Sequence, residues 1–358
     1  MDTLTQMDSL LEMIDRPAFW VKDGVITKLN QIAKNRQLSQ GMEIAPMIPE
    51  ASEEYSTFTQ GCLHLTVYIG QLPCNASVTR YPDGDIFLLE RDFDRVQLQT
   101  LALAAQQLRT PLSNVMTLTD QLLPALGESQ DENTRYQAAQ INRGLYQLLR
   151  IIANMADAER YTERDLSTME LTDFPVFISE IMKKASVMAE PVNVTLRYAC
   201  SKAHLIGLAD RELLERAIYN LLSNAIKFSP KNGVVDVTVT DTGKRLQISI
   251  QDQGNGIAPQ AQGTLFARYL REPGIEDSRF GLGLGMTLAH SAATAHAGTV
   301  LVDQPEGKGT RVTMSIAVSK DSGNLLRTPV LRIGDYIGGW DIALAEFSES
   351  LPADSYKY

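Results

Sequence analysis

The chain has 358 residues, 44% of them hydrophobic, and a formal net charge of −10. This composition is typical of a folded protein with two or three domains and excludes a largely disordered chain. The acidic charge argues against nucleic acid as the main partner, because a phosphate backbone needs a basic surface. Apolar runs fall short of the ~18–20 residues that cross a bilayer, and the first residues are acidic where a signal peptide is basic. We therefore expect no transmembrane segment and a cytoplasmic location.

Two turn motifs indicate a small α/β unit at the start of the chain. In FWVKDGVITKLN (19–30) an Asp-Gly pair separates two apolar runs, and SVTRYPDGDIFLLE (77–90) repeats the pattern with Pro-Asp-Gly. Both motifs predict β-hairpins, with a mostly helical insert between them. This order of hairpin, helices and further strands resembles a PAS-type sensor domain, which we assign to residues 1–92.

From Val96 onward the apolar residues follow a helical rhythm. Spacings that mostly alternate between three and four relate Leu98, Leu101, Ala105, Leu108, Leu112, Val115 and Leu122, and then Ala138, Ile141, Leu145, Leu148, Ile152 and Met155. Between these two runs, Ser129 and Glu132 have the spacing of a capping box. Residues 93–163 are therefore predicted to form a helical hairpin. Two amphipathic helices bury little surface alone, so we expect a homodimer that completes a four-helix bundle.

Residues 168–318 are predicted to form a second α/β domain. VVDVTVT (234–240) and RLQISIQ (245–251) alternate apolar and polar residues as half-buried strands do, and DTGK joins them. Helical patterns precede and follow these strands. Residues 319–358 match no pattern with a clear meaning, and they either add strands or dock on the dimer.

One helix of this domain, RELLERAIYNLLSNAIKF (211–228), has a distinctive polar stripe. Its apolar side gathers Leu214, Ile218, Leu221, Ala225 and Phe228, and its other side gathers Arg216, Asn220, Asn224 and Lys227. Arg216 fits an ordinary solvated face. The two asparagines and the lysine would suit a magnesium triphosphate, because amide oxygens are hard neutral ligands and an ammonium group binds phosphate oxygens. Taken alone, the stripe is more typical of a solvated helix.

Two glycine-rich stretches follow this helix. The strand RLQISIQ ends at Asp252, and Gly254 and Gly256 come next, where a ligand would approach the backbone closely. A carboxylate at a strand end can accept a hydrogen bond from the amino group of adenine, although an Asp-Gly turn explains the same residues. FGLGLGMTLAH then places glycine at every second position before a helix, as a phosphate cradle requires; these are Gly281, Gly283 and Gly285.

The motifs together resemble those of a known family. NLLSNAIKFSP, DQGNG, LFARYLR and FGLGLG resemble the N box, first glycine box, F box and second glycine box of the ATP-binding domain of sensor histidine kinases. That domain belongs to the GHKL superfamily, which includes gyrase and heat-shock chaperone ATPases. HAGTVLVDQPEGKGTRVTMSIAV (296–318) resembles its closing strands. The implied fold class is a multidomain α+β protein with a PAS-like domain, a dimerisation hairpin and a GHKL-type α/β sandwich.

The resemblance implies roles for individual residues. Asn224 would hold Mg²⁺ with Asn220 and Lys227 beside the phosphates of ATP, and Asp252 would bind adenine with support from Gly254 and Gly256. The glycines at 281, 283 and 285 would hinge a lid over about residues 258–280. Within this lid, Arg268 and Arg271 either neutralise phosphoryl charge or are solvated.

LRTPL (108–112) resembles the H box of the same family, in which a histidine and an acidic residue precede the leucine. This chain has Gln106 and Gln107 there. The nitrogen lone pair of an amide is delocalised, so Gln106 is no nucleophile, and Gln107 cannot act as a general base. We therefore expect no autophosphorylation at this position. Structural roles are expected for three histidines outside the predicted bundle helices, His204, His290 and His296.

Two other H-box residues carry expectations. Pro111 cannot donate a hydrogen bond to the carbonyl group of Gln107, so the helix should kink or loosen there. Thr110 occupies the position from which some family members orient water that hydrolyses a partner's aspartyl phosphate; the alternative is an ordinary helix-surface residue.

Three functional hypotheses remain open at this point. The leading one is a homodimeric two-component signalling protein that binds Mg·ATP, lacks the phospho-acceptor histidine and acts as a nucleotide-sensitive scaffold or pseudokinase, with a response-regulator receiver domain as its partner. The second is an active enzyme that phosphorylates another chain or dephosphorylates a response regulator. The third is a structural relic that binds no nucleotide.

Overall fold

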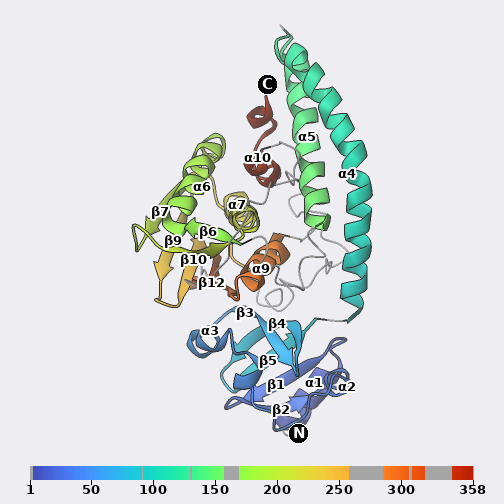
Figure 1. Cartoon of the computed structure of the whole chain (residues 1–358), viewed down its shortest axis with the longest axis vertical. Helices are drawn as coiled ribbons and strands as arrows, with labels where there is room; N and C mark the ends of the chain where they lie inside the picture. The colour runs from blue at the N-terminus through green and yellow to red at the C-terminus, as the bar shows by residue number, and fades with distance from the viewer. Residues whose placement is uncertain are drawn as a thin grey trace.

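A computed structural model of the chain describes residues 3–90, 92–129, 131–156, 169–257, 285–305, 309–318 and 341–357. Figure 1 shows an α/β unit at the N-terminal end, two long antiparallel helices that leave it along one side, and a second α/β unit beside them.

The N-terminal unit is an antiparallel sheet with short helices. Its elements are α1 (Thr3–Glu12), β1 (Ala18–Lys22), β2 (Val25–Leu29), α2 (Gln31–Asn35), η1 (Ala45–Met47), α3 (Ser52–Thr57), β3 (Cys62–Ile69), β4 (Leu72–Tyr81) and β5 (Gly84–Leu89). Both predicted hairpins are confirmed, since β1 pairs with β2 and β4 with β5. Asp23 and Gly24 take positive φ in the first turn, as a two-residue hairpin loop requires. The assignment of a PAS-type domain stays a prediction.

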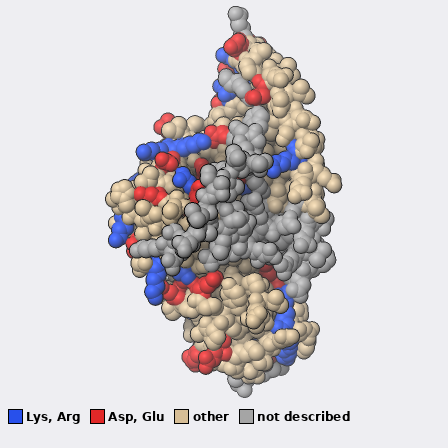
Figure 2. Space-filling view, viewed as in Figure 1, with Lys and Arg blue, Asp and Glu red and all other residues tan. Residues whose placement is uncertain are grey.

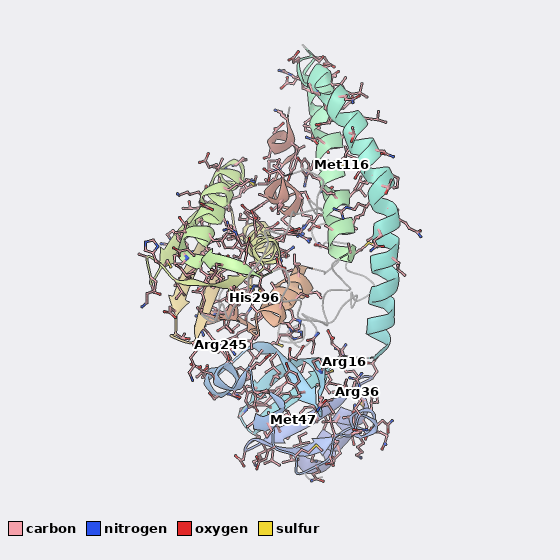
Figure 3. All side chains as sticks on the ribbon, in the orientation of Figure 1. Arg16, Arg36, Met47, Met116, Arg245 and His296 are labelled. Atoms are coloured by element: carbon pink, nitrogen blue, oxygen red, sulfur yellow. The ribbon has the colours of Figure 1, made fainter. Side chains whose placement is uncertain are left out.

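The helical hairpin consists of α4 (Asp92–Gly127) and α5 (Glu132–Ala156), and α4 continues through Pro111. Leu112 and Met116 of α4 share a buried cluster with Leu145 and Leu149 of α5, and Figure 3 labels Met116 on the ribbon of α4. These side chains hold the two helices together.

The predicted capping box before α5 is wrong. Asp131 caps the helix instead: its carboxylate oxygens accept hydrogen bonds from the backbone N–H groups of Asn133 (3.2 Å) and Thr134 (3.1 Å). Ser129 supports this cap, because its hydroxyl oxygen accepts from the N–H of Asp131. An aspartate directly before the first turn meets the unpaired N–H groups more directly than a serine two residues further away.

Among the described residues, the second α/β unit has five strands of a larger sheet, with helices on one face, and a separate two-stranded sheet. Its elements are β6 (Glu170–Asp173), α6 (Phe174–Ala189), η4 (Glu190–Val192), β7 (Thr195–Cys200), β8 (Ile206–Ala209), α7 (Arg211–Phe228), β9 (Val234–Asp241), β10 (Arg245–Gln251), α9 (Gly285–Ala295), β11 (Thr299–Asp303) and β12 (Arg311–Ala317). β9 and β10 form the predicted antiparallel pair. Alternate residues of both strands are buried, because α6, α7 and α9 cover one face of the sheet.

The two α/β units share one continuous sheet. β3 pairs with β11 in an antiparallel register, with Leu63 opposite Leu301, which gives the order β2-β1-β5-β4-β3-β11-β12-β10-β9-β7. Glu54 of α3 forms an ion pair with Arg245 of β10 at 2.7 Å and accepts a hydrogen bond from Ser315 of β12. Figure 3 places Arg245 at this junction. The N-terminal unit is therefore joined directly to the sheet that carries the site.

The C-terminal segment, residues 341–357, forms α10 (Ile342–Glu346) and η6 (Ala353–Tyr356). Figure 1 shows it beside α5, and it contacts α5 and α7 of its own chain. Residues 341–357 form no strand, so the expectation of added strands is wrong for this described part of the chain.

The described surface has no dominant charge on the face that Figure 2 shows. Small groups of acidic and basic side chains alternate over both α/β units there. Within the described ranges, no helix is both long enough and apolar enough to span a membrane.

Candidate functional site

The helix α7 is fixed at its N-terminal end by two side chains. Asp210 caps it by accepting a hydrogen bond from the N–H of Leu213 at 3.0 Å. The N–H of Asp210 donates to Nε2 of His296, which follows α9, at 3.0 Å. His296 Nδ1 in turn donates to the carbonyl of Ala292, so its ring is neutral and held in one orientation. This ties α7 to α9 and supports the structural role predicted for His296.

The polar stripe of α7 is pre-arranged by its own hydrogen bonds. Asn220 is fully buried, and its Oδ1 accepts a hydrogen bond from Nδ2 of Asn224 at 3.3 Å. That bond uses the amide nitrogen of Asn224, whose side chain is half-buried. Lys227 lies one turn further along the same side of the helix.

Arg216 departs from the prediction of a solvated side chain. It is only 2% exposed, and its guanidinium group bonds Oδ1 of Asn154 at 3.0 Å and Oε1 of Glu346 at 3.3 Å. A buried guanidinium needs a counter-charge, and Glu346 of the C-terminal segment supplies it. The apolar side predicted for α7 is buried, except that Phe228 is 44% exposed at the end of the helix.

Asp252 follows β10 as predicted, and its carboxylate is held in place. Its Oδ1 accepts hydrogen bonds from the backbone N–H groups of Gly254 (2.7 Å) and Thr310 (3.1 Å). Burial raises the pKa of Asp252, and these two N–H donors offset part of the rise. A buried carboxylate with a fixed orientation is suited to recognise one hydrogen-bond donor of a ligand.

The glycines of DQGNG bring this carboxylate to the end of α7. A Cβ atom on Gly254 would lie 2.6 Å from the carbonyl oxygen of Phe228, the last residue of α7. Gly256 has a φ of +75°, a conformation that residues with side chains rarely adopt. The chain after β10 therefore packs against the end of α7, next to Lys227.

The remaining predicted site residues are only partly within the described chain. Gly285 is the first residue of α9. Arg268, Arg271, Gly281 and Gly283 lie outside the described residues, and with them the predicted lid and F box. Their roles stay predictions.

Comparisons with known proteins identify the type of domain that contains these residues. Residues 209–320 match the family described as histidine kinase-, DNA gyrase B-, and HSP90-like ATPase. The chain is 28% identical over 218 residues to the sensor-like histidine kinase SenX3 of Mycobacterium tuberculosis (strain ATCC 25618 / H37Rv), which covers 60% of this chain and 52% of SenX3. The chain is similar to sensor histidine kinases, and residues 209–320 form an ATPase domain of the type these proteins carry. The predicted α+β class, with an ATPase domain of this type and a helical hairpin, is confirmed.

Two further matches show how much of this chain and of its relatives is similar. The histidine protein kinase DivJ of Caulobacter vibrioides is 30% identical over 241 residues, which cover 64% of this chain and 40% of DivJ. The crystal structure of full-length ShkA in complex with AMPPNP has 23% sequence identity and a TM-score of 0.50, and covers 62% of this chain and 46% of ShkA; this is a likeness of fold. The chain spans about half the length of SenX3 and less of DivJ.

The H-box residues of this histidine kinase relative lie on α4. Gln106, Gln107 and Thr110 are exposed there, as is Pro111. Within the described part of the hairpin, α4 and α5 contain no histidine. His290 is buried on α9, whereas His204 is 75% exposed and its Nδ1 lies 2.7 Å from Asp173 Oδ2, which lowers the pKa of Asp173.

The sequence analysis missed four residues that touch the site. Thr310 orients Asp252, and the sequence GKGT just before β12 was its only signal. Arg150 of α5 and two glutamates of the C-terminal segment, Glu346 and Glu349, form ion pairs beside the stripe of α7. Periodicity within α5 or within LAEFSESLP gives no indication that these two segments meet, because their contact is set by tertiary packing.

Proposed function

We propose that this histidine kinase relative is a two-component signalling protein that binds Mg·ATP at α7 and Asp252, lacks a phospho-acceptor, and acts as a nucleotide-sensitive scaffold. The observation that carries the proposal is the arrangement at α7 itself. Asn220, Asn224 and Lys227 line one side of the helix, and the loop of Asp252 packs against the end of that helix within an ATPase-type domain.

The side chains present fit the two halves of this ligand. At the phosphate end, the amide oxygen of Asn224 is a hard neutral donor suited to Mg²⁺, and Lys227 carries the charge that phosphate oxygens attract. At the base end, the fixed carboxylate of Asp252 accepts a hydrogen bond from the amino group of adenine, which guanine lacks at that position. Bound Mg²⁺ would neutralise part of the triphosphate charge.

Titration calorimetry tests this proposal on the full chain. Mg·ATP should give saturable heat, and Asn224→Ala should weaken Mg·ATP binding by about 10- to 100-fold because a metal ligand is lost. The matched control is Asn133→Ala, which changes an exposed asparagine of α5. Absence of heat with the wild-type chain would support the structural-relic alternative and contradict the proposal.

A labelling experiment tests the missing phospho-acceptor. With γ-labelled ATP, we expect no acid-labile phosphate on the wild-type chain, because neither Gln106 nor Gln107 supplies a nucleophile or a base. Gln106→His alone should restore little labelling, whereas Gln106→His with Gln107→Glu should restore more, since the carboxylate then assists the imidazole. Strong labelling of the single variant would refute this account of the H box.

The exposed hydroxyl of Thr110 supports a second candidate function, the dephosphorylation of a response regulator. The Thr110 hydroxyl is exposed on α4, where a receiver domain docked on the hairpin would meet it. If the chain dephosphorylates a response regulator, phosphate loss from a labelled receiver should accelerate in its presence, and Thr110→Ala should abolish the acceleration. Label that moves from ATP onto another chain would instead indicate a kinase that acts in trans.

A further inference from the structure

The C-terminal segment places a buried carboxylate on the predicted phosphate side of α7. Glu346 is 1% exposed, and its Oε2 accepts a hydrogen bond from Asn220 Nδ2 at 3.2 Å and lies 3.1 Å from Arg150 Nε. Its other oxygen bonds Arg216 at 3.3 Å. Asn220 is fully buried in this arrangement, so no nucleotide reaches its amide while Glu346 stays in place.

A second carboxylate of the same segment forms an ion pair with Lys227. Glu349 Oε2 lies 2.7 Å from Lys227 Nζ, and its Oε1 lies 3.2 Å from Arg150 Nη1. Burial by itself would raise the pKa of Glu349, but Arg150 and Lys227 outweigh burial and lower it. Glu349 is therefore charged at neutral pH, and its contact with Lys227 is lost only as the pH falls through this lowered pKa.

Apolar and backbone contacts hold the segment between two domains. Phe347 packs on Tyr219 of α7 with ring centroids 5.8 Å apart, and Tyr356 packs on Tyr146 of α5 at 5.5 Å. The carbonyl oxygen of Ser348 accepts hydrogen bonds from two further side chains of α5, Arg143 and Gln147. The segment thus links the ATPase domain to the helical hairpin.

We propose that the C-terminal segment is an intramolecular competitor for the phosphates of the nucleotide, with Glu346 and Glu349 in the place of the anion. This rests on the proposed Mg·ATP site. The cationic side chains of the cluster, Arg150, Arg216 and Lys227, outnumber its two carboxylates. Such a cluster attracts an anion strongly, and a triphosphate and the segment bind the same Asn220 and Lys227, so only one of them can be bound at a time.

Competition gives the protein two states with different links between its domains. With the segment docked, α7 is linked to α5 through it; with the nucleotide bound, this link is released, while the direct hydrogen bond between Arg216 of α7 and Asn154 of α5 stays. A ligand shifts such an equilibrium only through its different affinity for the two states. Here the docked state has a lower affinity for the nucleotide, because Glu346 and Glu349 already contact the side chains that would bind its phosphates. Linkage requires that the nucleotide weakens docking by the same factor by which docking weakens nucleotide binding.

The first test measures nucleotide affinity with the carboxylates neutralised. In the double variant Glu346→Gln/Glu349→Gln, which keeps side-chain size and the apolar contacts, Mg·ATP should bind at least about tenfold more tightly than in the wild-type chain, since two charge-assisted contacts of the competitor are weakened. Asp354→Asn removes the same kind of charge from the same segment but at an exposed site, where Asp354 pairs with Lys357, and should leave the affinity unchanged. Equal affinities of wild type and double variant overturn the inference.

The second test follows the wild-type segment itself and needs no variant. Hydrogen exchange of residues 341–357 should become at least tenfold faster when saturating Mg·ATP is added, because the bound nucleotide displaces the segment. Unchanged protection with nucleotide demonstrably bound overturns the competition while the proposed Mg·ATP site stands. If neither the wild type nor the double variant binds Mg·ATP, the proposed site itself is wrong.

Discussion

Asp252→Asn is expected to weaken Mg·ATP binding by about 100-fold. The position of Oδ1 is fixed by two N–H donors, Gly254 and Thr310, so the amide oxygen of an asparagine would occupy it. The amide nitrogen of this asparagine then faces the amino group of adenine. Both groups are hydrogen-bond donors, so the hydrogen bond to adenine is lost. Loss of a charged acceptor is worth about 1.5–3 kcal/mol, or roughly 10- to 150-fold in affinity.

The same variant should be more stable than the wild-type chain at neutral pH. Burial raises the pKa of Asp252, so ionisation of this carboxyl group lowers the free energy of unfolding as the pH rises through the raised pKa. Asparagine carries no charge at any pH. The gain in stability should be present at pH 7 and vanish below the ordinary pKa range of aspartate, where both chains are neutral. Chemical denaturation at the two pH values measures this.

Asp241→Asn is the matched control for both effects. Asp241 ends β9 in an Asp-Thr-Gly turn, and its Oδ1 accepts from the N–H of Gly243 at 2.7 Å, the same distance as in the turn of Asp252. It lies in the β9–β10 turn, so its replacement should leave Mg·ATP affinity unchanged. Similar losses of affinity in the two variants would show that Asp252 acts through the turn and not through the ligand.

The sequence pattern of a single helix or strand was enough to predict the parts of the site that this helix or strand forms by itself. Helical spacing alone puts Asn220, Asn224 and Lys227 on one side of α7, because residues four and three apart lie above one another. The end of an alternating strand likewise placed Asp252, and the glycine two positions later indicated the close approach that Phe228 makes. The two Asp-Gly hairpins followed from turn chemistry in the same way.

Contacts between distant segments could not be predicted. The period of the apolar residues, two in a strand and 3.6 in a helix, shows which face of an element is buried but not which other element packs against it. The pattern of β3 indicates a strand but does not name β11 as its neighbour. Arg216 resembles a solvated arginine until Glu346, 130 residues later, is brought beside it. The proposed ligand side, formed by α7 and Asp252, was therefore predictable from the sequence, whereas the opposing side, formed by the C-terminal segment, was not.

The helical hairpin has an exposed apolar face, which we expect to form the interface of a homodimer. Substitutions on this face should therefore abolish the dimer. Within the described part of α4 and α5, large apolar side chains remain exposed at Leu103, Leu108, Val115, Leu118, Leu122, Leu126, Tyr136, Ile141 and Leu148. Leu118 and Leu122 are 61% and 64% exposed. Apolar residues at helical spacing on two adjacent helices match the seam of a four-helix bundle, which a second copy of the hairpin would cover.

Leu118→Glu with Leu122→Glu should convert the dimer into a monomer. Burial of a leucine side chain contributes about 1.5–3 kcal/mol, and a two-fold dimer loses four of them, so dimer affinity should fall at least about 1000-fold. Analytical ultracentrifugation measures this, with Val187→Glu, a 65% exposed apolar residue of α6, as control. Both leucines are exposed in the single chain, so the variant should keep its helical content. A variant that stays dimeric would place the interface elsewhere, whereas a monomeric wild-type chain would leave this apolar face for a different partner.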